Sequence, residues 1–361
     1  MRWYASCEEF RAEFSALIES RAADLIEEYR FVEIPANRPP WTASGIKLAA
    51  GDRVSLFCAG RAWHAAAPSA WVGAHFSLWI RVGTRAPIFR PARGSASFTA
   101  ATTGELYLAN LFPGEWADLD GKLRSSPEIF TRVAGAFDVL VIRWRGETRD
   151  GLERMAAGGG RAAEMAGAEL RALLNPACPP SGWKYLWEAG DAECFSQSGE
   201  NGIRCEIVDD AAILQRTIAT ALTPATRLRW SWKIDKLPSA RAENSVATHD
   251  YLSVAVEFDN GRDLTYIWSA TLEPERSFDC PISFWRDRET HYVVRSGASQ
   301  LGRWVNEERS LMRDYERAIG PAPSKIVAVW LIAVGIFQHV DARCEIRAIE
   351  LVNGSEILRV S

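Results

Sequence analysis

Three neighbouring segments in the second half of the chain alternate apolar and polar side chains. Every second residue is apolar in residues 228–234, and the same pattern returns at 252–258 and at 264–268. Such alternation is typical of a β-strand with one buried face. The tetrapeptide Asp-Asn-Gly-Arg at 259–262 joins the last two segments, and Asn-Gly favours a β-hairpin turn. These segments therefore predict an antiparallel sheet, which constrains the second half to a mainly β fold.

Other parts of the second half extend this sheet. Further strands are expected at 203–208, 213–217, 292–295, 326–336 and 345–351, and a helix is expected at 303–319. A long loop at 237–248 leads into the strand at 252–258.

The first half shows a similar succession of short strands and turns. Strands are expected at 46–48, 53–59, 76–82, 96–99, 105–109 and 139–144, a pattern that favours a β-sandwich. Residues 7–30 carry an apolar stripe with helical spacing, and residues 148–175 favour two short helices separated by the Gly triplet at 158–160. The Pro-rich segment at 175–182 predicts a linker between domains.

Taken together, the segments predict a mainly β protein. It would contain two antiparallel β-sandwich domains, an N-terminal helix and a helical connector. The expected bounds are 1–34 for the helix and its lead-in, 35–147 for the first sandwich, 148–181 for the connector and linker, and 182–361 for the second sandwich.

Composition limits the classes of partner. The net charge of -4 is small, and basic residues are spread along the chain, so we expect neither nucleic acid nor a membrane as partner. The seven cysteines form no Cys-x-x-Cys pair, which favours buried, reduced thiols. The N-terminal residues lack the apolar segment of a secretory signal, so a cytoplasmic location is expected. No cofactor motif is found, and a homo-oligomer is compatible with the sequence.

Two polar residues, His249 and Asp250, stand where the long loop enters the strand at 252–258. Polar groups at such an entrance can face a ligand while the sheet fixes their position. Asp250 would serve as acceptor or base and His249 as a proton carrier, or both would be structural residues at a strand end. Since neighbouring strand residues point to opposite faces, a His–Asp dyad would require a bulge. Glu257 and Asp250 are an alternative carboxylate pair for glycoside hydrolysis.

A ligand-binding wall is expected beside this pair. Tyr266 and Trp268 lie on the second strand of the predicted hairpin. Arg295, together with Trp268 or Trp304, would hold a carboxylate beside an aromatic surface. His339 follows an apolar strand and is expected near the same rim. A further polar cluster consists of Arg288, Glu289 and His291.

Two stretches of the first half resemble a lectin family. Residues 41–60 contain an Ala-Gly-Asp turn and an apolar strand that ends in Ala-Gly, and residues 107–121 contain Asn-Leu-Phe-Pro-Gly. They are similar to the opening and the calcium loop of the galactose-specific, calcium-dependent lectins of the PA-I type. The resemblance implies a galactose-binding-like jelly roll for the first sandwich.

The same loop departs from the lectin pattern at its calcium ligands. Leu111 and Leu119 stand where the lectins have oxygen ligands, and Asp118 and Asp120 are the carboxylates that remain as weak metal candidates. Because calcium requires six to eight oxygen ligands, we expect this loop to bind calcium weakly or not at all.

The second half resembles more closely the bacterial domain-of-unknown-function family 3047. The resemblance rests on residues 228–235, 250–251, 266–269, 293–297 and 301–305. It covers nearly the whole second domain and implies no activity. Members usually have Asp-Asp-Tyr where this chain has His249-Asp250-Tyr251, so an imidazole replaces a carboxylate.

Two functions are compatible with these observations. The first is binding of a carbohydrate or another small polar-aromatic ligand by the two β-sandwich modules. The second is an enzyme of the lyase or hydrolase type, in which His249 and Asp250 act as acid and base on an anionic small molecule. The first is favoured because no catalytic motif is present and because the resemblance in the first half is to a lectin.

Overall fold

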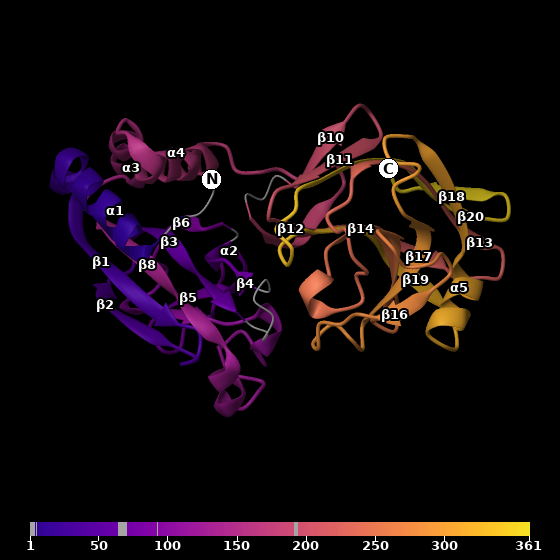
Figure 1. Ribbon diagram of the computed structural model, residues 1–361, viewed down its shortest axis with the longest axis horizontal. Coiled ribbons are helices and arrows are strands. Elements are labelled where there is room, and N and C mark those ends of the chain that lie inside the picture. The colour runs from indigo at the N-terminus through magenta and orange to yellow at the C-terminus, as the bar shows by residue number, and fades with distance from the viewer. Residues whose placement is uncertain (1–3, 5, 64–70, 92, 191–193) are drawn as a thin grey trace. The chain divides into compact units, whose positions relative to one another are not determined.

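The computed structural model describes residues 4, 6–63, 71–91, 93–190 and 194–361. The chain forms two compact units, Met1–Ala177 and Cys178–Ser361, which Figure 1 distinguishes by colour along the sequence. The division falls within the Pro-rich segment at 175–182. Both units consist mainly of antiparallel sheets, which confirms the predicted fold class.

The first unit has two sheets among its described residues. The larger sheet has the order β1–β8–β3–β4, with β6 paired to β3, and the smaller has the order β2–β7–β5. The strands are β1 (Ile26–Pro35), β2 (Thr42–Leu48), β3 (Arg53–Trp63), β4 (Trp71–Val72), β5 (Leu78–Val82), β6 (Ser95–Thr99), β7 (Gly104–Asn110) and β8 (Ala134–Trp144). Short helical turns are η1 (Ala23–Leu25), α2 (Ala74–Ser77), η2 (Pro113–Glu115) and η3 (Pro127–Arg132).

Three helices pack on the larger sheet. They are α1 (Cys7–Arg21), α3 (Thr148–Ala156) and α4 (Gly160–Leu174). Phe10 and Phe14 of α1 and Met155 of α3 join Phe57 and Leu140 of the sheet in one apolar cluster. The two helices expected as a connector therefore form part of the core of the first unit.

The N-terminal helix is shorter than the sequence predicted. It begins after Ser6, whose side chain accepts a hydrogen bond from the backbone amide of Glu9, and it ends at Arg21. Residues Ile26–Pro35 form β1, which pairs antiparallel with β8. The expected helix over 7–30 is wrong in its second half, because pairing with β8 outweighs the helical spacing of the apolar residues.

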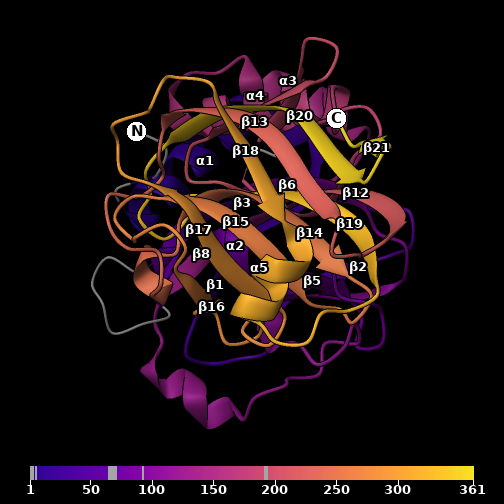
Figure 2. The same ribbon diagram turned by 90° about the vertical axis from the view of Figure 1, so that its right-hand side faces the viewer.

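The second unit is a sandwich of two sheets. Its six-stranded sheet has the order β10–β11–β20–β13–β18, with β21 paired to β20. The strands are β10 (Phe195–Ser198), β11 (Gly202–Ile207), β13 (Thr226–Lys236), β18 (Val305–Ser310), β20 (Ala342–Asn353) and β21 (Glu356–Arg359). Figure 2 shows β18, β13 and β20 side by side in this sheet.

The seven-stranded sheet has the order β16–β17–β15–β14–β19–β12–β9 in the described part of the chain. Its strands are β9 (Lys184–Ala189), β12 (Ala211–Ala221), β14 (Tyr251–Phe258), β15 (Asp263–Ser269), β16 (Ser277–Asp279), β17 (Glu289–Ser296) and β19 (Lys325–Val334). The predicted hairpin joins β14 to β15, and Gly261 has the positive φ of 77° that favours glycine in the turn. Strands β15 and β17 pair in parallel, which is an exception to the predicted antiparallel pattern.

The main core of the second unit lies between the two sheets. Trp230 and Trp232 of β13 pack against Tyr266 and Trp268 of β15, with ring centroids 5.5 Å apart for Trp230–Tyr266 and 5.8 Å apart for Trp232–Trp268. The expected helix over 303–319 is only partly correct. Val305–Ser310 forms β18, an edge strand paired with β13, and the helix α5 is limited to Leu311–Ala318.

A second apolar cluster lies on the opposite face of the seven-stranded sheet. Its sheet residues include Tyr251, Ile267, Val293 and Trp330. Segments outside the regular strands contribute Ala242, Leu272 and Trp285 to the same cluster, and β16 contributes Phe278. The segments at 237–250 and 270–288 therefore cover this face, and we call them the cover segments. The short turn η4 (Val246–Thr248) lies in the first of them.

Candidate functional site

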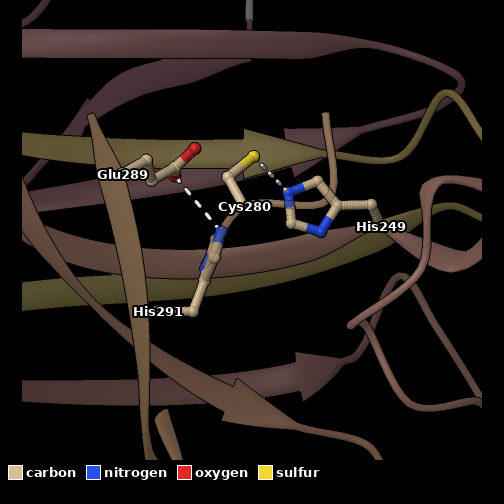
Figure 3. Close-up of side chains that lie close together, drawn as sticks. All are labelled: His249, Cys280, Glu289 and His291. Carbon is tan, nitrogen blue, oxygen red and sulfur yellow. Dashed lines mark hydrogen bonds and ion pairs between the residues drawn. The ribbon is translucent and has the colours of Figure 1, made fainter. Parts of the chain in front are cut away.

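Four buried side chains with metal-binding chemistry meet beneath the cover segments (Figure 3). They are His249, Cys280, Glu289 and His291, and we call them the buried tetrad. Their exposed fractions are 1%, 0%, 5% and 0%. His249 lies near the end of the first cover segment, Cys280 follows β16 in the second, and Glu289 and His291 lie two residues apart on β17. The two residues of β17 share a face because side chains alternate along a strand.

The ring of His249 is held in one orientation by two contacts. Its Nδ1 lies 2.7 Å from the backbone oxygen of Glu243, and a carbonyl can only accept, so Nδ1 carries the proton. The other nitrogen, Nε2, then presents a lone pair 3.3 Å from Sγ of Cys280. Glu243 is itself fixed, because its carboxylate accepts hydrogen bonds from the Ser269 hydroxyl and the Ala270 amide.

Glu289 and His291 differ in how well their polar atoms are satisfied. The Tyr251 hydroxyl donates a 2.7 Å hydrogen bond to Oε1 of Glu289. Among the described residues, neither ring nitrogen of His291 has a hydrogen-bond partner, and its Nε2 lies 3.5 Å from the same Glu289 oxygen. The His291 ring stacks on Phe278 with centroids 4.8 Å apart.

Burial controls the protonation of these groups. Desolvation lowers the pKa of His249 to about 4 and moves the pKa of His291 well below its usual value, so both imidazoles are neutral near pH 7. Desolvation also raises the pKa of the Cys280 thiol and that of the Glu289 carboxyl. The site therefore brings together two neutral nitrogen donors, a thiol and a carboxyl group in a dry environment.

Asp250, expected beside His249 as a catalytic acceptor, has different partners. Its Oδ1 accepts a hydrogen bond of 3.0 Å from the Phe337 amide, and its Oδ2 accepts one of 2.6 Å from the Gln338 amide. It is fully buried, and burial raises its pKa to about 7. Both carboxylate oxygens are thus used to fix the turn after β19. This geometry argues against the expected His249–Asp250 acid–base pair.

The expected aromatic wall is not next to His249. Tyr266 and Trp268 point into the core between the sheets and are 0% and 1% exposed, so they are unavailable to a ligand. Arg295 lies over the Trp268 ring, 5.6 Å from its centroid, and forms an ion pair of 2.5 Å with Glu307. The reason is the alternation of side chains along β15, which sends Tyr266 and Trp268 to the face opposite the buried tetrad.

The remaining candidates of the second unit also lie apart from the tetrad's atoms. His339 binds Asp209 through Nδ1 at 2.6 Å, in the turn that Asp250 helps to fix. Glu257 is at the far end of β14, where it pairs with Arg288 at 2.9 Å. A carboxylate pair of Glu257 and Asp250 is therefore wrong, because about seven residues of extended strand, roughly 23 Å, separate them.

Trp304 occupies a second, open site on the six-stranded sheet. It is 37% exposed and borders a groove of about 830 Å³. The guanidinium of Arg347 lies 3.8 Å from the centre of the Trp304 ring. Polar residues of the groove include Ser181, Gln197, Asn201, Arg216 and Glu345. We call this site the Trp304 groove.

The charges of the Trp304 groove are unevenly paired. Glu345 forms an ion pair of 3.0 Å with Lys233 and accepts a hydrogen bond from Ser198. Within the described part of the chain, neither Arg216 nor Arg347 has a carboxylate partner. The groove therefore has free guanidinium groups beside an exposed indole.

The lectin-like loop of the first unit has a self-contained structure. Leu111 is fully buried, whereas Leu119 is 69% exposed. Oδ1 of Asp118 accepts hydrogen bonds from the backbone amides of Asp120 and Lys122. The Asp118 carboxylate thus closes its own turn, and weak or absent calcium binding stays a prediction.

Sequence reasoning missed Cys280 and separated His249 from Glu289 and His291. The spacing Glu-x-His on a predicted strand was an available signal that two potential ligands share one face. No local motif marks Cys280, because the cover segment brings it to the sheet. None of the seven cysteines forms a disulfide; Cys58, Cys194, Cys205, Cys280 and Cys344 are buried as expected, whereas Cys7 is half-buried and Cys178 is exposed. No helix among the described residues is long and apolar enough to cross a membrane.

Structural neighbours of the chain include lectins, carbohydrate-binding modules and glycoside hydrolase domains at low identity. The N-terminal domain of EclA, a PllA-like lectin, has 18% identity, covers 31% of this chain and 94% of its own, and has a TM-score of 0.25. The xyloglucanase domain of NopAA from Sinorhizobium fredii, solved with cellobiose, has 9% identity, covers 48% and 94%, and has a TM-score of 0.32. A carbohydrate-binding module of the β-sandwich superfamily has 8% identity, covers 89% and 98%, and has a TM-score of 0.22.

These structural values are too low to assign a function. No curated protein matches the sequence. A family model does match, and it covers most of the second unit. As the sequence predicted, residues 191–350 match the family described as a protein of unknown function, DUF3047.

Proposed function

We propose that the second unit binds a carbohydrate or another small polar ligand in the Trp304 groove. The observation that carries the proposal is the exposed Trp304 ring with an unpaired guanidinium, that of Arg347, stacked on it at the edge of the groove. A volume of about 830 Å³ lies in the usual range of small-molecule sites.

The chemistry of the groove suits a polyhydroxylated ligand. An indole offers a large apolar surface at little cost in conformational entropy, and it can pack on the C–H face of a sugar ring. Stacking on Trp304 restricts the Arg347 guanidinium, so that its planar set of N–H donors is positioned before the ligand arrives. The Ser181 hydroxyl can donate to or accept from sugar hydroxyls, and the Gln197 side-chain oxygen can accept from them, while the Gln197 nitrogen already donates to backbone oxygens of the β10–β11 turn.

The unpaired arginines favour a ligand that carries an acidic group. Arg216 and Arg347 both line the groove, and a carboxylate could accept paired N–H bonds from either. This narrows the expected ligand to a sugar or similar small molecule with a carboxylate. The geometry disfavours the alternative, an enzyme with His249 and Asp250 as acid and base, because both oxygens of Asp250 and both ring nitrogens of His249 already have partners.

Calorimetric titration with defined sugars tests this proposal. Digalacturonate and the neutral digalactose of the same linkage would be titrated into the full chain, and we expect tighter binding of the acidic sugar. Trp304→Ala should weaken binding at least about tenfold, which corresponds to about 1.4 kcal/mol. Arg347→Gln should remove the preference for the acidic sugar. The control Arg313→Gln changes a charge on an arginine that is 73% exposed on α5. Equal affinities of wild type and Trp304→Ala for both sugars would contradict the proposal.

A further inference from the structure

The atoms of the buried tetrad are arranged as a set of metal ligands would be. One potential ligand atom from each residue lies within 4.8 Å of the others. His249 Nε2 lies 3.3 Å from Cys280 Sγ, and His291 Nε2 lies 3.5 Å from Glu289 Oε1. A tetrahedral zinc site with bonds of about 2.0–2.3 Å places its ligand atoms roughly 3.3–3.8 Å apart. Small side-chain rotations would therefore complete such a site.

The unsatisfied ring of His291 is an independent observation that points to a ligand. A buried polar atom without a hydrogen-bond partner destabilises the folded state, and within the described residues both ring nitrogens of His291 are in this state at 0% exposure. Phe278 stacks on the face of the His291 ring. A phenylalanine at position 291 could make the same stacking contact, so packing does not account for an imidazole there. Coordination of a metal ion through a ring nitrogen of His291 would satisfy a polar atom that packing alone leaves without a partner.

The surrounding residues orient the tetrad as outer partners of a metal do. The Glu243 carbonyl fixes the proton of His249 on Nδ1, so the lone pair of Nε2, which faces Cys280 Sγ at 3.3 Å, can coordinate a metal. The Tyr251 hydroxyl holds the Glu289 carboxylate. Hydrogen bonds of this kind to coordinating imidazoles and carboxylates fix ligand orientation and tune affinity in metal sites.

Charge balance favours a divalent cation. Within the described residues, Glu289 forms no ion pair with a lysine or arginine, although it is 5% exposed. A buried carboxylate without a cation is costly. A divalent ion bound by one carboxylate, one thiolate and two neutral imidazoles gives a site with no net charge. The mixture of nitrogen, sulfur and oxygen donors suits zinc better than calcium or magnesium, which prefer oxygen donors alone.

We propose that the buried tetrad is a structural binding site for one Zn²⁺-class divalent transition-metal ion. All four coordination positions are filled by side chains, as in structural sites, whereas catalytic zinc keeps a position for water or substrate. The Cys280 thiol loses its proton to solvent when it coordinates, so metal binding releases protons. The ion links both cover segments to β17 and thereby fastens them to the seven-stranded sheet.

Metal content and cobalt spectroscopy of the full chain test the proposal. Protein freed of metal with a chelator would be loaded with Zn²⁺ alone or Co²⁺ alone and then dialysed. We expect one Zn²⁺ per chain by elemental analysis. Cobalt should give the visible bands of a tetrahedral site and a near-ultraviolet thiolate-to-cobalt charge-transfer band. Cys280→Ala should remove the charge-transfer band, and His291→Ala should lower zinc affinity more than about 100-fold.

Matched variants separate loss of a ligand from loss of folding. Cys58→Ala removes a buried thiol of the first unit and should leave the metal content and the cobalt bands unchanged. Circular dichroism would show whether each variant folds. If the tetrad variants do not fold, the wild-type cobalt spectrum decides, because tetrahedral bands with thiolate charge transfer require this type of site. Wild-type protein without stoichiometric zinc, or an unchanged cobalt spectrum in folded Cys280→Ala, would overturn the proposal and leave the tetrad as a packed aromatic cluster.

Discussion

The buried tetrad and the Trp304 groove contrast strongly, although both belong to the second unit. The tetrad lies under the cover segments, with residues at most 5% exposed and a histidine whose ring nitrogens have no hydrogen-bond partner in the described part of the chain. The groove is open to solvent, and its unpaired groups are arginines that water can hydrate. An unsatisfied atom costs much in a dry site and little in a wet one. We therefore expect the ligand of the tetrad to stabilise the fold, and the ligand of the groove to bind and dissociate while the protein stays folded.

Metal removal is the largest test of this contrast. At a free zinc concentration about 1,000 times the dissociation constant, zinc binding should add about 4 kcal/mol to the free energy of unfolding. Urea unfolding with zinc and with excess chelator would measure the difference. Sugar affinity in the groove should be the same in both conditions while the protein remains folded. A stability that does not respond to chelation would remove the contrast between the two sites.

Asp250 tests whether the neighbour of His249 has a functional or a structural role. Asp250→Asn keeps one acceptor oxygen but places an amide N–H₂ against a backbone N–H of the turn after β19, so we expect a loss of about 1–3 kcal/mol in the free energy of unfolding. Thermal or urea unfolding would measure it, with the exposed Asp287→Asn as control. Unchanged stability together with lost ligand binding would restore Asp250 as a functional residue.

A partly exposed ion-pair network around Glu275 should show the smallest effect. Glu275 binds Arg309 at 2.7 Å and Arg317 at 2.9 Å, and the hydrogen bond from Arg309 is the main reason why its pKa falls to about 2. Its side chain is 41% exposed, so we expect the network to contribute less than about 1 kcal/mol. A lowered carboxyl pKa stabilises the folded state above the unfolded value, and this contribution is lost as pH falls.

The pH window for Glu275 follows from these values. The pKa of the Glu275 carboxyl is 4.5 in the unfolded chain and falls to about 2 in the folded protein. The stability difference between wild type and Glu275→Gln should be fully present at pH 6 and should shrink between about pH 4.5 and pH 2. Urea unfolding at several pH values would measure it, and a difference that does not change over this range would contradict the assignment.

The sequence predicted regular elements better than the sites. Period-two alternation correctly predicted β13, β14 and β15, and Asn260-Gly261 correctly predicted the hairpin between β14 and β15. Both signals are local in the sequence. Residues 305–310 were expected in a helix, since the apolar spacing fits one, but pairing with β13 makes them an edge strand. Local spacing does not contain the information about a partner strand far away in the chain.

The candidate sites show the same limit. The place of His249 at a strand entrance can be predicted from the sequence. Its proximity to Cys280 and Glu289 cannot, because it depends on how the second cover segment folds over the sheet. Trp268 was expected to face a ligand, but it packs against Trp232 in the core between the two sheets. The alternation at Trp230-x-Trp232 indicates that such a core exists, but not that Trp268 points into it. Trp304 was expected to act with Arg295, but the guanidinium stacked on it is that of Arg347 on β20, whereas Arg295 lies over Trp268.

The strand order of the second unit has a consequence for folding during synthesis. β20 lies between β11 and β13, and β19 lies between β14 and β12, so the middle of each sheet is formed by strands that the ribosome makes late. Before β19 and β20 emerge, β11, β12, β13 and β14 each lack a partner strand and expose an unpaired edge. The first unit repeats this arrangement on a smaller scale, since β8, its last strand, lies between β1 and β3. In each unit, the interval before the late central strands are translated is therefore the stage at which binding by a chaperone would matter most.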